Sequence, residues 1–518
     1  MLHEDPVIHD RRWFVLGVMC LSLVLVVASV SGLNVAIPSL QRDLGATATE
    51  LQWIIDAYAL VFAGVLLTAG ALGDRFGRKR ALLGGLVIFA AGALVSGLAT
   101  QAAQVIAGRA ITGIGAAFVM PATLSIITTV FPPLERRRAI AIWAGFAGAG
   151  AAFGPLVSGA LLEGFWWGSA LLFNVPVVAG IIVAVGVFAP ESRDPDATPL
   201  DPVGAVLSLV GLTALVFGVI EGPDRGWTSE VVLGAFAVTV VCLGAFVVWE
   251  RRTPHPMLPM QLFGDRRFSV GAAVITTTFF VMLGFFYLST QYLQFVRGYS
   301  PFEAGAAMLP LALTMLVVSP RSAGLAERWG SGRVIAVGFL CVAAGCALLA
   351  TVSPTSPYLE WAAVLVLLAM GMALTMAPST GSIMSAVPMA KAGVGSAVND
   401  TTREVGGALG IAVLGTIINA GYRSRIDLAG LPLPPPARAA AEESVGAATA
   451  LARSIPGGDE LAHRAGEAFT HAFHVANLTS VALLVAGAAV VSIVFNRRAE
   501  EAANREFDEQ HPPVASSQ

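Results

Sequence analysis

Long apolar runs separated by short charged loops dominate this sequence. An α-helix needs about 20 apolar residues to cross about 30 Å of hydrocarbon, and the runs of that length are centred near residues 24, 62, 90, 115, 150, 179, 211, 239, 279, 312, 342, 368, 408 and 483. With 56% hydrophobic and 13% charged residues, the chain has too little polar surface to cover a soluble globule. We therefore predict an all-α integral membrane protein with 14 transmembrane helices.

The loop charges predict the orientation of these helices. Clusters of arginine and lysine fall in alternate loops, at 75–80, 136–138, 251–252, 266–267, 328–333 and 497–498. The intervening loops after the third, fifth and eleventh runs carry neither residue. By the positive-inside rule, both termini are cytoplasmic and the chain is a multi-pass protein of the cell membrane, either a plasma or an inner membrane. The net charge of −3 gives no reason to expect a nucleic-acid partner.

An internal repeat predicts the architecture. The segment 69–77, Ala-Gly-Ala-Leu-Gly-Asp-Arg-Phe-Gly, recurs in weakened form at 322–330 as Ser-Ala-Gly-Leu-Ala-Glu-Arg-Trp-Gly. Parallel repeats of this kind are a transporter design in which the substrate path lies between the halves. We expect a six-helix half at 13–190, a linker with two inserted helices at 191–264, a second six-helix half at 265–498 with a long outer loop at 423–466, and cytoplasmic tails at 1–12 and 499–518. Helical spacing within 437–455 predicts a short surface helix over the outer mouth.

Several motifs lie at defined places among the runs. They are Gly73-Asp74-Arg75-Phe76-Gly77-Arg78-Lys79 after the second run, Gly108-Arg109-Ala110-Ile111-Thr112-Gly113-Ile114-Gly115 in the fourth, Gly154-Pro155 within the glycine-rich stretch 148–159 of the fifth, and the segments 34–38, 53–58 and 201–204. Together they resemble the major facilitator superfamily, and specifically its 14-helix drug:proton antiporter family, along nearly the whole chain.

The resemblance implies a function. It implies a secondary active antiporter, and not an enzyme, that exports amphipathic drugs or antibiotics in exchange for protons by alternating access. Such a protein uses the proton gradient and no cofactor, and we expect it to work as a monomer in the lipid bilayer. Two alternatives stay open: a narrow exporter of one endogenous metabolite or antibiotic, and a non-transporting relative with a receptor or lipid-handling role. Ser29 stands where that family commonly has a helix 1 aspartate, so proton coupling must rest on other carboxylates.

The charged loop after the second run is the first candidate functional segment. A carboxylate at Asp74 can cap a neighbouring helix, and an arginine such as Arg75 or Arg78 can pair with carboxylates of the other half. Gly73 and Gly77 fit a tight turn beside them. We interpret this segment as a breakable latch of one access state; the alternative is a set of charges that only fixes topology.

The fifth run is rich in small residues that allow close helix approach. Gly148, Gly154 and Gly159 let a facing helix come near, and Pro155 adds a bend. The resemblance implies that this helix lies at the boundary between the halves, where a tight seam blocks leakage. Ordinary close packing is the alternative.

Ionisable residues within membrane spans are functional candidates because burying charge is unfavourable. Asp56, Arg109 and Asn34 are predicted at one depth and could form a polar cluster. An aspartate that exchanges an arginine partner for a proton suits proton coupling, and a permanent structural bond is the alternative. In the thirteenth run, Asp400 and Glu404 are four residues apart and share a helix face, where two carboxylates tend to keep one proton between them.

Arg403 lies beside these two carboxylates, and its internal pairing with Asp400 is the structural alternative to a coupling role. For the substrate, an apolar and adaptable wall is predicted, with Asn34, Phe286, Tyr287, Tyr292 and Met315 as candidate binding residues. We expect no catalytic residue and no metal site, since the four cysteines fall inside apolar runs and lack metal-site spacing.

Overall fold

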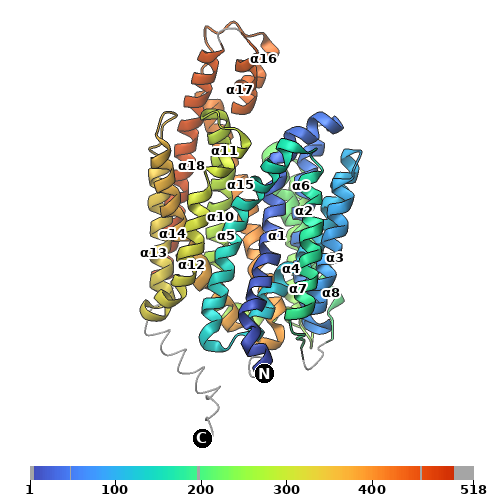
Figure 1. Cartoon of the computed structure of the whole chain (residues 1–518). Helices are drawn as coiled ribbons and strands as arrows, with labels where there is room; N and C mark the ends of the chain where they lie inside the picture. The colour runs from blue at the N-terminus through green and yellow to red at the C-terminus, as the bar shows by residue number, and fades with distance from the viewer. Residues whose placement is uncertain (1–4, 47, 195–198, 456–457, 495–518) are drawn as a thin grey trace.

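The computed structural model describes residues 5–46, 48–194, 199–455 and 458–494, and these residues form helices without a β-strand (Figure 1). The elements are α1 (Pro6–Leu44), α2 (Ala48–Phe76), α3 (Arg78–Gly97), α4 (Ala102–Val130), α5 (Pro133–Gly164), α6 (Ser169–Leu172), α7 (Asn174–Phe188), α8 (Pro202–Arg225), α9 (Glu230–Glu250), η2 (Met260–Gly264), α10 (Arg266–Gln291), η3 (Tyr292–Val296), α11 (Pro301–Ala306), α12 (Leu309–Trp329), α13 (Ser331–Leu349), α14 (Tyr358–Ala386), η4 (Met389–Lys391), α15 (Ala392–Arg425), α16 (Pro435–Glu443), α17 (Val445–Ser454) and α18 (Asp459–Val494).

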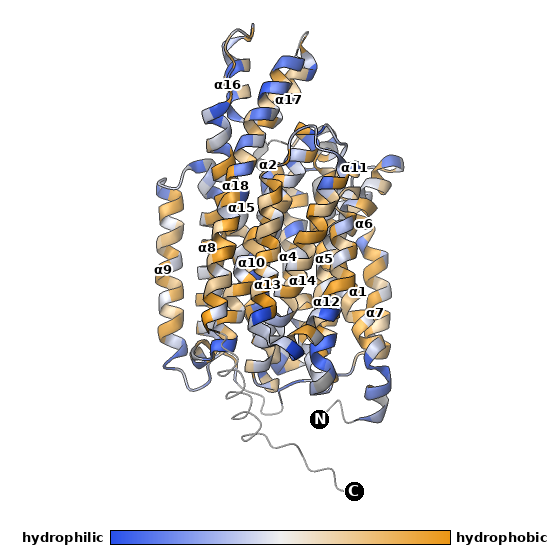
Figure 2. Ribbon diagram, turned by 90° about the vertical axis from the view of Figure 1, so that its left-hand side faces the viewer, coloured by the Kyte–Doolittle hydropathy of each residue, from blue (hydrophilic) through white to orange (hydrophobic). Residues whose placement is uncertain are grey.

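The helices confirm the predicted membrane spans. Within the described residues, 14 helical segments are long and apolar enough to cross a bilayer. Each of the 14 centres predicted from the sequence falls inside one of them. Figure 2 shows the result as an apolar middle zone with hydrophilic residues gathered toward both ends of the bundle.

The two largest buried clusters divide the bundle into halves. One cluster draws almost wholly on α1–α7, and the other almost wholly on α10–α18. The inserted pair α8 and α9 lies outside these halves: α8 packs on α2 and α15, and α9 packs on α8 at the edge of the bundle (Figure 2). The fold is therefore the predicted one, two six-helix halves with two inserted helices.

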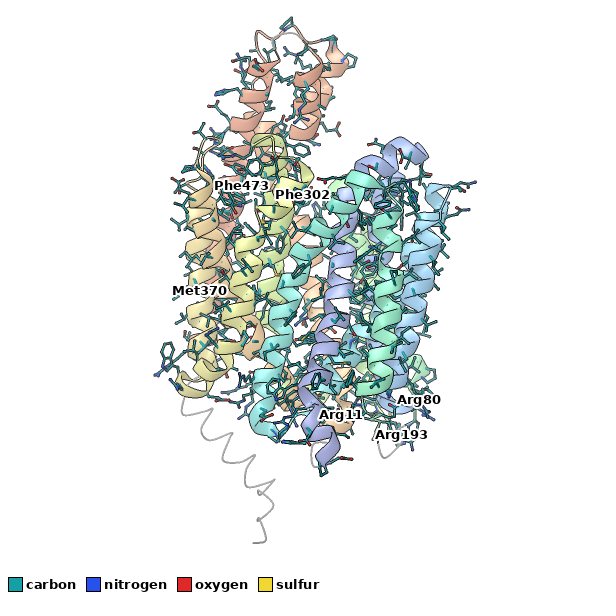
Figure 3. The ribbon with its side chains drawn as sticks, in the orientation of Figure 1. Arg11, Arg80, Arg193, Phe302, Met370 and Phe473 are labelled. Carbon is teal, nitrogen blue, oxygen red and sulfur yellow. The ribbon has the colours of Figure 1, made fainter. Side chains whose placement is uncertain are left out.

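The two ends of the bundle differ in character. Arg11, Arg80 and Arg193 lie together at one end, which we call the basal face (Figure 3). The opposite end, the distal face, carries α16 and α17, which project beyond the bundle (Figure 1). Figure 3 also places Phe302 toward the distal end.

The structure differs from the sequence expectations in several local features. α1 already begins at Pro6, within the segment predicted to be a tail. Arg12, also in that segment, donates a hydrogen bond from its Nε to the Glu135 carboxylate of α5 at 2.7 Å. The predicted single surface helix is two helices, because Ser444 ends α16 and its hydroxyl caps α17 by accepting from the Ala447 N–H at 3.1 Å. The predicted tail at 499–518 lies outside the described residues.

Candidate functional site

Asp74, near the end of α2, joins the two halves at the basal face. Its Oδ1 accepts a hydrogen bond from the Gly393 N–H at 2.8 Å, and its Oδ2 accepts one from the Val394 N–H at 3.0 Å. Both amides belong to the first turn of α15, where backbone N–H groups lack an intrahelical acceptor and favour negative charge. Asp74 thus caps a helix of the other half, 319 positions along the chain.

Arg78 completes this latch from the start of α3. Its Nε and Nη2 donate to Asp74 Oδ1 at 2.9 Å and 2.7 Å. Nη2 also donates across the interface to the carbonyl oxygens of Met389 at 2.7 Å and Ala390 at 3.2 Å. Arg78 thus contacts the other half, and its acceptors there are backbone carbonyls and not the carboxylates that the sequence led us to expect.

A tight turn between α2 and α3 holds these two side chains together. The Gly77 N–H donates to the Gly73 carbonyl at 3.0 Å, and Gly77 has a φ of +116°. A Cβ at Gly77 would lie 2.6 Å from the Glu191 carboxylate, so a side chain would be both strained and obstructed. The Arg75 guanidinium carbon lies 5.5 Å from the centroid of the Phe76 ring.

The repeated segment reproduces the turn but not the latch. Gly330, the counterpart of Gly77, also has a positive φ, +84°. Glu327 occupies the position equivalent to Asp74 and is exposed, whereas Asp74 is buried. Among the described residues, the buried carboxylate that caps a helix of the other half therefore occurs in one of the two repeats.

The connections that flank α8 and α9 are attached to the same latch. Before α8, the Ser192 carbonyl accepts a hydrogen bond from the Arg78 N–H at 2.9 Å. After α9, the Pro256 carbonyl accepts one from Lys391 Nζ at 2.7 Å, next to the start of α15. Sequence reasoning missed both contacts because their acceptors are backbone carbonyls, which leave no sequence signature.

α5 packs closely against its neighbours through its small residues. Toward α1 of its own half, a Cβ at Gly154 would lie 2.7 Å from the Gly32 backbone nitrogen, so the two helices touch through their backbones. Pro155 lies inside α5, and a Cβ at Gly305 of α11 would lie 2.9 Å from the Pro155 Cβ. α5 is thus packed closely on both sides.

The contacts of α5 with the second half extend along its length. Gly148 faces the side chain of Met315 on α12, because a Cβ built at Gly148 would lie 2.8 Å from the Met315 methyl carbon. Nearer the distal end, a Cβ at Gly159 would lie 3.1 Å from the Phe302 ring. α5 therefore lies at the boundary between the halves, and its role as a barrier to leakage stays a prediction.

Asp400 and Arg403 form a buried pair on α15. Arg403 Nη1 and Asp400 Oδ1 are 3.5 Å apart, with side chains only 3% and 1% exposed. The Arg403 guanidinium carbon lies 4.8 Å from the Trp143 ring centroid of α5 and 5.3 Å from that of Phe279 on α10. Trp143 in turn donates its Nε1–H to the Thr123 hydroxyl at 3.2 Å. The ion pair thus reaches the other half through an aromatic ring.

Asp400 is supported on one side only. Its Oδ1 accepts from Asn399 Nδ2 at 3.3 Å, and Oδ1 of the same Asn399 side chain accepts from the Thr380 hydroxyl at 3.0 Å. Its Oδ2 is buried without a hydrogen-bond partner in the described structure. Since α15 begins at Ala392, Asp400 lies about 12 Å along the helix axis. That depth is well inside the membrane zone.

Glu404 lies one turn further along α15, and Tyr58 links it to Arg109. Glu404 is half-buried, and its carboxylate interacts electrostatically with the Tyr58 phenol of α2. The Arg109 guanidinium carbon of α4 lies 4.5 Å from the centroid of the same ring. A cation of the first half and a carboxylate of the second therefore share one tyrosine.

The expected cluster of Asp56, Arg109 and Asn34 stays a prediction, and the structure describes the contacts of Arg109. Arg109 Nε donates to the Ile54 carbonyl at 3.1 Å, while its Nη1 and Nη2 are buried without a hydrogen-bond partner in the described structure. Arg109 therefore does not hydrogen-bond to the half-buried Asp56 in this conformation. The side chain of Asn34 lies outside the described residues. The coupling role of these residues stays a prediction.

The candidate substrate residues whose side chains are described differ in exposure. Met315 is fully buried on the α5–α12 contact, whereas Tyr287 is 38% exposed and Phe286 is half-buried. Tyr292 is 1% exposed and stacks between Trp361 and Phe473, within the second half. Tyr292 therefore presents no open ring face to a ligand in this conformation.

Trp143 and Tyr58 are interface residues to which sequence reasoning assigned no role of their own. Tyr58 was part of a recognised segment, and Trp143 lies in the glycine-rich fifth span. A buried indole needs a hydrogen-bond acceptor, so a tryptophan in an otherwise small-residue apolar helix is a signal that could have marked Trp143.

Comparisons with known proteins agree with this architecture. A family model described as the Major Facilitator Superfamily matches residues 19–411. The multidrug efflux pump LfrA of Mycolicibacterium smegmatis is 36% identical over 491 residues, which cover 94% of this chain and 97% of that protein. The tetracenomycin C resistance and export protein of Streptomyces glaucescens is 31% identical, covering 96% and 95% respectively.

A solved structure shows the same fold. The human organic anion transporter MFSD10 superposes with a TM-score of 0.62 at 17% identity, over 91% of this chain and 99% of that one. The family match spans most of the chain, and the relatives align over nearly their full length. The chain belongs to the Major Facilitator Superfamily, and is therefore a membrane transporter and not an enzyme.

Proposed function

We propose that this transporter is a proton-coupled antiporter that exports amphipathic drugs or antibiotics from the cell. The observation that carries the proposal is the placement of Asp400 and Glu404 deep in the bundle, where α15 meets Trp143 and Tyr58 of the other half. Charge at such a depth is unfavourable and is kept mainly where ions or protons move. With Ser29 neutral, these carboxylates and Asp56 are the available proton carriers.

The latch supports alternating access. Asp74 and Arg78 hold α15 against the first half through hydrogen bonds, which can break and re-form as a set. With the basal face assigned to the cytoplasm from its arginines, the latch closes the cytoplasmic side. The opposite access state then requires these bonds to open, in a chain that we propose acts as a monomer with cytoplasmic termini.

The proton gradient supplies the energy in this proposal, and no cofactor is required. A proton that enters down a membrane potential of 100 mV releases about 2.3 kcal/mol. One or two protons for each substrate molecule therefore support a substantial concentration gradient.

The range of exported substrates could be broad or narrow, and one relative supports each. A broad range of amphipathic compounds is supported by the relative that is a multidrug efflux pump. A narrow range, confined to one antibiotic or metabolite, is supported by the relative named for export of tetracenomycin C. The same fold can carry either range because substrate choice depends on the site and not on the fold.

The test is transport by the purified protein in proteoliposomes under an imposed pH gradient. The panel contains cationic dyes, neutral dyes and a planar aromatic antibiotic, with no-gradient and protonophore controls. Gradient-dependent movement of several unrelated compounds supports the broad antiporter, and movement of a single compound supports the narrow one. If the antibiotic and every dye stay in place under either gradient direction, the antiporter proposal is wrong.

A further inference from the structure

The pair formed by Asp400 and Arg403 has an unusual geometry. Buried arginine and carboxylate groups that pair tightly make short, often bidentate hydrogen bonds. Here the closest distance is 3.5 Å, and Arg403 Nε, Nη1 and Nη2 all lack hydrogen-bond partners within the described residues. Asp400 Oδ2 also has none. The two side chains are adjacent, but the guanidinium does not donate to the carboxylate.

The aromatic rings around Arg403 explain this separation. The guanidinium lies between Phe279, which belongs to the same half, and Trp143, which belongs to the other half. Attraction between a buried cation and these ring faces competes with the carboxylate for the guanidinium. Trp143 is itself fully buried, and its hydrogen bond to Thr123 fixes the ring within the first half. The position of Arg403 therefore depends on the distance between the halves.

We propose that Trp143 is a positioning residue that decides, through Arg403, whether Asp400 holds a proton. While α5 and α15 are together, Trp143 holds Arg403 away and a proton can stay on Asp400 Oδ2. When the halves separate at this level, Arg403 loses the ring and donates to Asp400. The proton then leaves Oδ2 for water in the opened path, and the pair changes from a net charge of +1 to zero. This inference rests on the proposed proton coupling and names its switch.

The other groups at this level are consistent with the assignment. Glu404 interacts with both Asp400 and Arg403 on α15 and disfavours a second negative charge beside it. From the first half, Tyr58 of α2 faces Glu404, and Arg109 of α4 lies over Tyr58. Within the described residues, α8, α10, α14 and α18 place no charged side chain against Asp400 or Arg403. Arg403 is therefore the cation that can replace the proton.

The test compares Trp143→Leu, which removes the ring, with Trp143→Phe, which keeps a ring face and loses only the indole N–H. Two readouts are made on the full-length protein in lipid. The first is the infrared carbonyl band of protonated carboxyl groups, followed across pH and assigned to Asp400 by its loss in Asp400→Asn. The second is the pH profile of export. In Trp143→Leu we expect both to move about one pH unit toward acid, a tenfold change in proton concentration. Trp143→Phe keeps a ring face but loses the hydrogen bond to Thr123, so it should move both readouts by less than Trp143→Leu does.

A matched control and a second variant make the test decisive. Trp361 is another buried tryptophan and stacks on Tyr292, whereas the rings over Arg403 are those of Trp143 and Phe279, so Trp361→Phe should leave both readouts unchanged. If Trp143→Leu does not fold, Thr123→Val is used instead. It keeps the Trp143 ring but removes the hydroxyl that holds it, so both readouts should move toward acid pH by a smaller amount. An unmoved carboxyl band in folded Trp143→Leu, or in Thr123→Val where Trp143→Leu does not fold, overturns the inference. The infrared readout does not depend on transport, so the two failures can be told apart. Absence of proton-dependent export in wild type contradicts the proposed function and not the role of Trp143.

Discussion

Replacing Asp74 with asparagine should release the basal latch. The carboxylate accepts four hydrogen bonds, two from Arg78 and one each from the amides of Gly393 and Val394. The asparagine amide has one acceptor oxygen, and its NH2 group would face a backbone N–H or the Arg78 guanidinium. Two donors cannot form a hydrogen bond, so part of the set is lost. Arg78 would also remain buried without its counter-charge, and removing one partner of a buried ion pair typically loses about 3–5 kcal/mol.

Asp74 and Arg78 belong to the same half, so in the proposed latch the energy that acts on the equilibrium between access states is that of the two bonds to α15. Each is a hydrogen bond to a charged group and contributes about 1.5–3 kcal/mol. With about 1.4 kcal/mol for each tenfold change, a loss of about 3 kcal/mol shifts the equilibrium roughly 100-fold toward opening. The sensitive reporters are the amide hydrogens of Gly393 and Val394. They lie in the first turn of α15 and take Asp74 as their acceptor.

The assay is hydrogen–deuterium exchange of the peptide that contains these two amides, measured in lipid nanodiscs, together with export in proteoliposomes. We expect exchange there to be about 100-fold faster in Asp74→Asn and export to be lost, with the helix cores still protected. Glu327→Gln is the matched control, because Glu327 occupies the equivalent position of the repeat and is exposed. Unchanged exchange at the two amides together with normal export in Asp74→Asn would refute the latch.

Three further changes test other contacts. A Cβ at Gly70 would lie 2.6 Å from a carbonyl oxygen of α15, so Gly70→Ala should speed the same amide exchange, whereas Gly84→Ala, with nothing within 4 Å, should not. The Tyr292 hydroxyl donates to a loop carbonyl at 2.6 Å, so Tyr292→Phe should lower the free energy of unfolding by about 1 kcal/mol, measured by chemical denaturation, with export retained. Arg109→Lys keeps the charge but loses the planar contact with Tyr58, and initial export rates should fall at least about tenfold if Arg109 serves coupling.

The transmembrane helices were predictable because their signal is local. Each span is a continuous apolar run, and its length alone decides whether it crosses the membrane, so every predicted centre lies in a span. The turn at Gly77 was equally readable, since the repeat places a second glycine with positive φ at Gly330. The surface helices were harder, because Ser444 can continue a helix or cap the next one, and only the backbone shows which.

The sequence predicted which residues could serve the site but not which groups they contact. The sequence indicated that Asp74 could cap a helix, yet the capped amides are 319 and 320 positions away, and nothing local identifies them. Asp56 and Arg109 lie at similar predicted depths, but Arg109 turns to a backbone carbonyl and an aromatic ring. Depth along a helix says nothing about the direction in which a side chain points around the bundle.

The arginines show most clearly what the sequence lacks. Arg109 and Arg403 are both buried guanidiniums that rest on an aromatic ring and leave terminal nitrogens without hydrogen-bond partners in the described structure. For Arg109 the ring belongs to its own half, but for Arg403 one ring belongs to the other. A cation held by rings can be released by a small movement, because the attraction is less directional than a bidentate hydrogen bond. Of these two arginines, Arg403 is the one that contacts a ring of the other half, so in the proposed alternating access its partner changes when the halves separate.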